Sequence, residues 1–286
     1  MPNVVSRFAR SWQLIQASCN VLRADKALLI LPALSGLATT ALAIGFVTLA
    51  MSNGILTAKS GSLNVFGPLH VWLFCWYVVQ YFLVIFFNTA LVGAAIALLN
   101  GERPTVGAAF KMALSHIAAI LGYAVISATI GVLLQALAER LGLLGRLIEV
   151  MLGLTWTAAT FLVVPILAAE NIGPWQAIKR STALLRKTWG ENLIGNAGIS
   201  LATSMISGWV GVIGVSGAMV LFELGHPVVG VTLLCASAST LLLIVLVAAA
   251  LSAIYAAAVY HYAVVGTPPT NFDGDLIRGA FTRKGT

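Results

Sequence analysis

The run 214–217, GVSG, places Ser216 between glycines inside a long stretch without charge. A serine hydroxyl becomes a nucleophile for hydrolysis when a histidine lies within about 2.6–3.2 Å and accepts its proton. The sequence offers His226, in a short loop before a proline, and His261, near the far end of the next apolar stretch. His226 is held in the loop before Pro227, and His261 lies most of a bilayer away from Ser216, so neither can act as its base. We therefore expect no catalytic serine and no enzyme.

Other chemistry-bearing residues are sparse. Cys19, Cys75 and Cys235 are too few and too scattered for a disulfide framework or a zinc site, and we expect free apolar thiols. The sequence has no phosphate-binding glycine loop, no dinucleotide fingerprint and no paired carboxylates for acid and base catalysis. We therefore expect no cofactor, no metal and no catalytic residue.

Uncharged polar residues inside apolar stretches are the remaining candidates: Asn88, Thr89, Thr155, Thr157 and Thr160. Polar groups at membrane depth favour a functional hypothesis, here the lining of a path for a neutral or apolar small molecule. The alternative is hydrogen bonding that holds neighbouring helices together. No Asp, Glu, Lys or Arg lies at the centre of these stretches, which argues against an ion-coupled transporter or a charge-lined pore.

The composition indicates which elements position these residues. The chain has 286 residues, of which 59% are hydrophobic and only 9% charged, and its mean hydropathy is +0.97. Soluble domains carry about 25% charged residues, so a soluble domain is excluded. The charges leave six uncharged tracts: 27–58, 60–101, 112–138, 150–169, 192–222 and 224–272.

Each tract is long enough to cross a bilayer as a helix, which needs about 20 apolar residues. The sequence therefore predicts an all-α polytopic membrane protein, with the last tract forming one long helix. We expect a single membrane domain over 1–266 and a cytoplasmic tail over 267–286. The predicted spans are about 27–50, 69–99, 113–137, 150–168, 193–222 and 228–264.

The distribution of Lys and Arg predicts the orientation. With the N-terminus in the cytoplasm, thirteen of the 16 Lys and Arg residues fall on the cytoplasmic side, and only Lys59, Arg140 and Arg146 fall outside. Under the positive-inside rule, this bias places both termini in the cytoplasm of a bacterial-type inner membrane. The net charge of +7 then reflects topology and attraction to anionic lipid. A nucleic-acid partner is not expected, because no soluble basic face is available.

The segment 174–188 combines an apolar stripe with basic residues. Pro174 suits a first helical turn, and the stripe recurs at helical spacing: Trp175, Ile178, Thr182, Leu185 and Trp189. This pattern is typical of a helix lying among lipid headgroups. Segments 6–24 and 105–112 also precede spans, which suggests three helix-plus-hairpin repeats. The residues expected to bind anionic headgroups are Lys179, Arg180, Arg186, Lys187, Arg7 and Arg10.

Small residues recur along the fifth predicted span: Gly208, Gly211, Gly214 and Gly217, with Ser204, Ser207 and Ala218 at related spacing. In lipid, small residues four apart let helix backbones approach closely and pack. We interpret this face as a helix-packing surface. The partner helix is either within the same chain or on a second subunit.

Several motifs resemble an uncharacterised family of prokaryotic six-span membrane proteins, a domain of unknown function. They are residues 86–92 followed by Gly101, Pro104 and Thr105; residues 178–181 and 185–192; and the segment from Ser11-Trp12 to Asp25-Lys26. The resemblance covers nearly the whole chain and implies a fold and a membrane location, but no activity. The chain is also distantly similar to the membrane part of some glycerophosphodiester phosphodiesterases, without their catalytic domain.

Together these patterns favour a non-enzymatic inner-membrane protein that acts as a scaffold, an accessory subunit or a lipid-handling module. Its expected partners are anionic membrane lipids, with a homo-oligomer or a membrane partner subunit as a further alternative. The alternative function is a pore or permease for a neutral or apolar small molecule. In that case Asn88 and the threonines of the fourth span would line the path.

Overall fold

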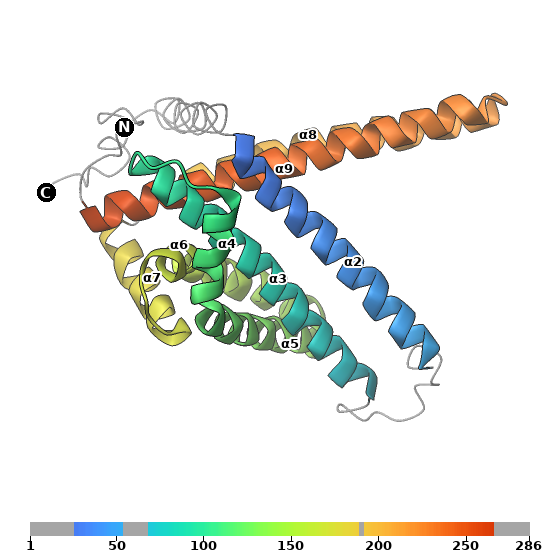
Figure 1. Ribbon diagram of the computed structural model, residues 1–286. Helices are drawn as coiled ribbons and strands as arrows, with labels where there is room; N and C mark the ends of the chain where they lie inside the picture. Colours follow the sequence, from blue (N-terminus) through green and yellow to red (C-terminus); the bar gives the residue numbers. More distant parts are fainter. Residues whose placement is uncertain (1–25, 54–67, 189–191, 266–286) are drawn as a thin grey trace, which may run out of the picture. The chain divides into compact units, whose positions relative to one another are not determined.

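The computed structural model describes residues 26–53, 68–188 and 192–265, and helices joined by short turns make up these ranges (Figure 1). No strand occurs in them, which confirms the predicted all-α fold. The helices in chain order are η1 (Lys26–Leu29), α2 (Ile30–Ser52), α3 (Pro68–Leu99), α4 (Val106–Ser115), α5 (Ile117–Thr160), α6 (Val163–Ala169), α7 (Pro174–Thr188), α8 (Asn192–Glu223) and α9 (Pro227–Val265).

Six helical segments among the described residues are long and apolar enough to cross a membrane: Ile30–Ser52, Val71–Leu99, Ile117–Gly142, Leu144–Ala169, Thr203–Glu223 and Pro227–Val265. The length and composition of these segments confirm the prediction of six membrane-spanning helices. The shortest segment has 21 residues, which is enough for a hydrocarbon core of about 30 Å. The last uncharged tract forms the single helix α9, as expected.

Two helices begin at or next to the first residue of a predicted segment, 105–112 and 174–188. The Thr105 hydroxyl accepts a hydrogen bond from the Ala108 amide at 3.2 Å, so it caps α4. Pro174 is the first residue of α7. The third span starts at Ile117, later than the predicted residue 113. The reason is that α4 continues to Ser115 and the backbone then leaves helical geometry at His116.

The helices α2 to α7 belong to one compact unit, residues 30–187. Its central element is α3, which packs against α2, α4, α5 and α6. Between α2 and α3, the ring of Phe46 lies 4.9 Å from Trp72 and 5.1 Å from Trp76, measured between ring centroids. Between α3 and α4, the Phe110 ring lies 5.5 Å from Phe87. These ring contacts fix the neighbours of α3 on two sides.

Near its middle, α5 turns at Gly142, which has φ +59° and ψ −130°. L-residues with a side chain rarely adopt this positive φ, so a glycine is required there. Gly145 is needed for a second reason. A Cβ on Gly145 would lie 2.8 Å from the carbonyl oxygens of Leu137 and Ala138, where it does not fit. The turn therefore separates the third and fourth spans, between the predicted spans 113–137 and 150–168.

The second compact unit contains η1, α8 and α9, and α8 packs along α9 (Figure 1). The turn between them has Gly225 at φ +77°. The amide of His226 donates to the Leu221 carbonyl at 2.9 Å, which closes a glycine C-cap of α8. Pro227 then starts α9. The 39 residues of α9 correspond to about 58 Å of helix, which exceeds a hydrocarbon core of about 30 Å.

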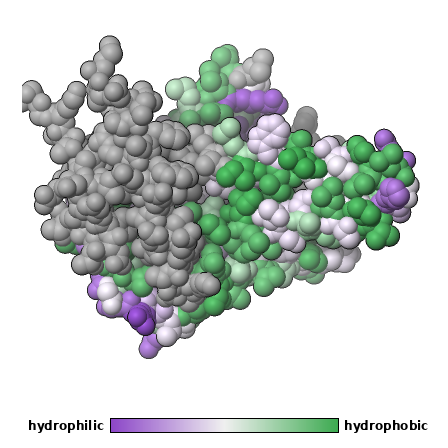
Figure 2. Space-filling view, turned by 90° about the horizontal axis from the view of Figure 1, so that it is seen from above, coloured by the Kyte–Doolittle hydropathy of each residue, from purple (hydrophilic) through white to green (hydrophobic). Residues whose placement is uncertain are grey.

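Large hydrophobic side chains are exposed along the spans, and Figure 2 shows hydrophobic residues over much of the visible described surface. Leu37, Ile44, Met151, Trp209 and Leu243 are each more than 60% exposed. Soluble proteins rarely expose apolar patches larger than a few hundred Å². An apolar outer surface of this kind suits contact with lipid chains.

Candidate functional site

Ser181 attaches α7 to the spans behind it. Its side chain is fully buried, and its hydroxyl donates to the Ala159 carbonyl at 2.7 Å and accepts from the Leu162 amide at 3.2 Å. Both partners lie at the interruption between α5, which ends at Thr160, and α6, which begins at Val163. One hydroxyl therefore satisfies two backbone groups where the helical hydrogen-bond ladder is broken.

The first turn of α7 also lies close to α5. A Cβ on Gly122 would be 2.8 Å from Pro174 Cγ, so the absence of a side chain at residue 122 makes room for the proline ring. Four apolar side chains of α7 are buried together with Ser181: Ala177, Ile178, Leu184 and Leu185. Hydrogen bonds and apolar packing thus fix which side of α7 faces outward.

The outward side carries the two basic residues of α7 whose side chains the structure describes. Lys179 and Arg180 are both exposed. The Nε atom of Arg180 lies 3.4 Å from Oε1 of Glu170, an exposed ion pair that orients the guanidinium more than it stabilises the fold. Lys179 Nζ lies 5.8 Å from the centroid of the Trp175 ring, within the range of a cation–π contact. We call Trp175, Lys179 and Arg180 the basic face of α7.

The structure divides the predicted apolar stripe of α7. Ile178 and Leu185 are buried in the protein, whereas Trp175 is 59% exposed. The helix is amphipathic, but its apolar side packs into its own unit and does not face lipid. The physical reason is Ser181, a polar residue that the stripe omitted and that needs the buried carbonyl and amide. Trp189, Arg7 and Arg10 lie outside the described residues, as do the side chains of Arg186 and Lys187.

The uncharged polar candidates lie within the first unit. Thr89 is fully buried and Asn88 is exposed, although they are adjacent on α3. The hydroxyls of Thr89, Thr155, Thr157 and Thr160 each donate to the carbonyl four residues earlier at 2.8 Å. Thr155 and Thr157 are two positions apart, about 200° around a helix of 3.6 residues per turn. The threonines of the fourth span therefore do not line one common path.

The glycines of α8 separate into two kinds. A Cβ on Gly214 would collide with Ser237 of α9, and a Cβ on Gly217 would lie 2.8 Å from Leu233 Cδ2. Gly208 and Gly211 have no atom within 4 Å of the corresponding position. The structure thus places Gly214 and Gly217 against α9 and leaves Gly208 and Gly211 open.

Ser216 lies on the same helix, far from His261. It is exposed, and its hydroxyl donates to the Val212 carbonyl at 2.6 Å. Because Gly214 and Gly217 meet Ser237 and Leu233 on α9, His261 is more than 20 positions farther along α9. At about 1.5 Å per residue, His261 therefore lies more than about 30 Å along α9 from the residues that face Ser216's part of α8. Ser216 and His261 therefore do not form a nucleophile–base pair.

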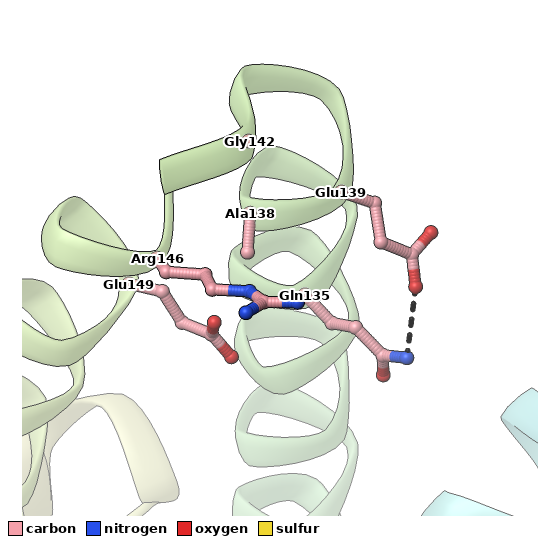
Figure 3. A pocket seen from close by; sticks show the side chains of 6 residues that line it. All are labelled: Gln135, Ala138, Glu139, Gly142, Arg146 and Glu149. Atoms are coloured by element: carbon pink, nitrogen blue, oxygen red, sulfur yellow. Dashed lines mark hydrogen bonds between the residues drawn. The ribbon is translucent and has the colours of Figure 1, made fainter. Parts of the chain in front are cut away.

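Sequence reasoning missed two features. The first is Ser181. Its position on the buried side of an amphipathic helix could be read from the sequence, but only the fold reveals its two backbone partners. The second feature is a pocket at the turn of α5, lined by Gln135, Ala138, Glu139, Gly142, Arg146 and Glu149 (Figure 3). Its charged residues lie between two predicted spans, but the turn that brings them to one pocket was not predicted.

Comparison with known proteins gives a family but no activity. The model of one protein family, described as a family of unknown function (DUF6159), matches residues 68–270. That range begins at α3 and includes α4 to α9, so it contains both the basic face of α7 and the pocket at the turn of α5. A search of curated proteins gives no match.

Proposed function

Because the chain belongs to the family of unknown function DUF6159, we propose a function from its own geometry. The protein is a non-enzymatic lipid-handling module of the membrane. It binds anionic phospholipid headgroups on the basic face of α7. Both termini and α7 lie on the cytoplasmic side, where the positive-inside rule places most of its Lys and Arg residues.

The observation that carries this proposal is the division of α7 into two sides. Ser181 and its buried neighbours hold one side against the spans, which leaves Lys179 and Arg180 exposed on the other. Because α7 is already held in place, its backbone does not have to lose conformational freedom when a ligand binds to Lys179 and Arg180. Preorganisation of this kind lowers the entropic cost of binding.

The chemistry of the basic face suits a phosphate group at a membrane surface. Guanidinium binds phosphate oxygens through paired N–H donors, and ammonium binds them as a point charge. Trp175 beside Lys179 offers an amphipathic ring of the type enriched at the membrane interface. Glu170 orients the Arg180 guanidinium but does not bury it, because the Arg180 side chain remains 47% exposed.

Replacing Lys179 and Arg180 together by glutamine is expected to weaken binding of phosphatidylglycerol. Each basic residue near an anionic surface contributes about 1 kcal/mol, so losing two weakens binding about 30-fold. Native mass spectrometry of the purified protein, titrated with phosphatidylglycerol in detergent, measures this change.

A matched control removes two positive charges elsewhere. The double variant Lys59→Gln and Arg140→Gln has the same net charge, but its changes lie in connections that the positive-inside rule places on the opposite side of the membrane. Phosphatidylglycerol binding should stay close to that of the unchanged protein. Equal weakening in both double variants would mean that net charge alone governs binding, and the basic face of α7 would lose its assigned role.

A further inference from the structure

The turn of α5 forms a pocket that the basic face of α7 does not involve. It is an open pocket of about 450 Å³, within the range of about 300–1,000 Å³ that is usual for small-molecule sites. Gln135, Ala138 and Glu139 come from the segment before Gly142, and Arg146 and Glu149 come from the segment after it. Figure 3 shows Arg146 extending from the second segment across the first.

The pocket contains both signs of charge. Gln135 Nε2 donates to Glu139 Oε1 at 3.1 Å, which holds one carboxylate in place. Among the described residues, no ion pair of Arg146 or Glu149 is found, although both line the same pocket. A ligand complementary to this arrangement carries a phosphate-like anion for the guanidinium and an N–H cation for the carboxylates.

The surface around the pocket is apolar. On the second segment, Leu144 is 72% exposed and Leu147 is 59% exposed, and on the first segment Leu133 is 63% exposed. In a membrane-crossing chain, such side chains face acyl chains. The pocket therefore offers charges to a headgroup and leucines to the tails of the same molecule.

We propose that the pocket at the turn of α5 binds a phospholipid whose headgroup combines a primary ammonium with a phosphodiester, as in phosphatidylethanolamine. Arg146 binds the phosphate, and Glu149 accepts hydrogen bonds from the ammonium. A choline headgroup has no N–H to donate, and quaternary ammonium is usually held by aromatic rings. None of the six lining residues is aromatic. An anionic headgroup without an amine would meet two carboxylates with nothing to offset them.

The test compares palmitoyl-oleoyl phosphatidylethanolamine with phosphatidylcholine of the same chains, each titrated into the full-length protein and followed by native mass spectrometry. We expect the ethanolamine lipid to bind about tenfold more tightly. Arg146→Gln and Glu149→Gln should each abolish this tenfold preference. Arg140→Gln is the matched control, because Arg140 is an exposed neighbour that does not line the pocket.

Two further arms separate the alternatives. The Lys179→Gln and Arg180→Gln double variant should keep the ethanolamine preference, so failure of the α7 proposal is distinguishable from failure of this one. Soluble glycerophosphoethanolamine in large molar excess should not displace the lipid, because it lacks the chains that the leucines contact. Equal binding of the two lipids, an equal loss in Arg140→Gln, or displacement by the soluble headgroup would overturn the proposal. Thermal unfolding of each variant verifies that the fold is intact.

Discussion

Replacing Ser181 by alanine is expected to lower the free energy of unfolding of the protein by about 2–3 kcal/mol. The change removes the donor to the Ala159 carbonyl and the acceptor for the Leu162 amide. Leu162 is fully buried within a membrane-crossing segment, so no water is available to replace the lost bond. Unfolding in a titration of denaturing detergent, followed by circular dichroism, measures the difference.

The adjacent residue provides the control. The hydroxyl of Thr182 donates to the Lys179 carbonyl on its own helix at 2.8 Å, near the exposed side of α7. Thr182→Ala should therefore leave stability nearly unchanged. The amide of Leu162 should exchange its hydrogen faster in Ser181→Ala and at the normal rate in Thr182→Ala. If the two variants unfolded alike, Ser181 would not attach α7 to the break between α5 and α6.

Replacing Gly214 by leucine is expected to push α8 away from α9. The free energy of unfolding should fall by at least about 1–3 kcal/mol. Even a Cβ at this position would collide with Ser237 of α9. The collision includes the Cβ atom of Ser237, which no rotamer can move away, so the backbones must shift. The distance between spin labels attached at the exposed residues Met219 of α8 and Val231 of α9 should increase in this variant.

Gly208 and Gly211 are matched controls on the same helix, because nothing lies within 4 Å of their Cβ positions. Gly208→Leu and Gly211→Leu should preserve the hairpin, and the loss of a helical glycine should add up to about 1 kcal/mol of stability each. If all three variants lost the α8–α9 contact equally, the close approach at Gly214 would not govern the packing. Loss of the α8–α9 contact only in Gly208→Leu or Gly211→Leu would likewise contradict the packing role of Gly214.

Much of the fold could be predicted because membrane insertion depends on local composition. Uncharged tracts of sufficient length mark spans, since a charge at the centre of a spanning helix is costly. Local residues likewise marked the starts of α4 at Thr105 and α7 at Pro174. The turn before α9 follows from Gly225 and Pro227, whose backbone preferences need no tertiary information.

The candidate sites depended on contacts that local patterns do not contain. Gly208 and Gly214 occur in the same spacing pattern, yet only Gly214 meets α9. The stripe on α7 was read from apolar residues alone, whereas Ser181 settles which side is buried by reaching backbone atoms about 20 residues away. Arg146 and Glu139 meet in one pocket only because Gly142 turns the chain between them.

The most direct test of the central claim asks which side of the membrane carries the basic face of α7. Cys19, Cys75 and Cys235 are replaced by serine, and single cysteines are introduced as Lys179→Cys and as Arg140→Cys. A membrane-impermeant maleimide is added to intact spheroplasts and, separately, to permeabilised ones. We expect labelling of Arg140→Cys before permeabilisation and of Lys179→Cys only afterwards. Labelling of Lys179→Cys in intact spheroplasts would contradict the proposed orientation of α7.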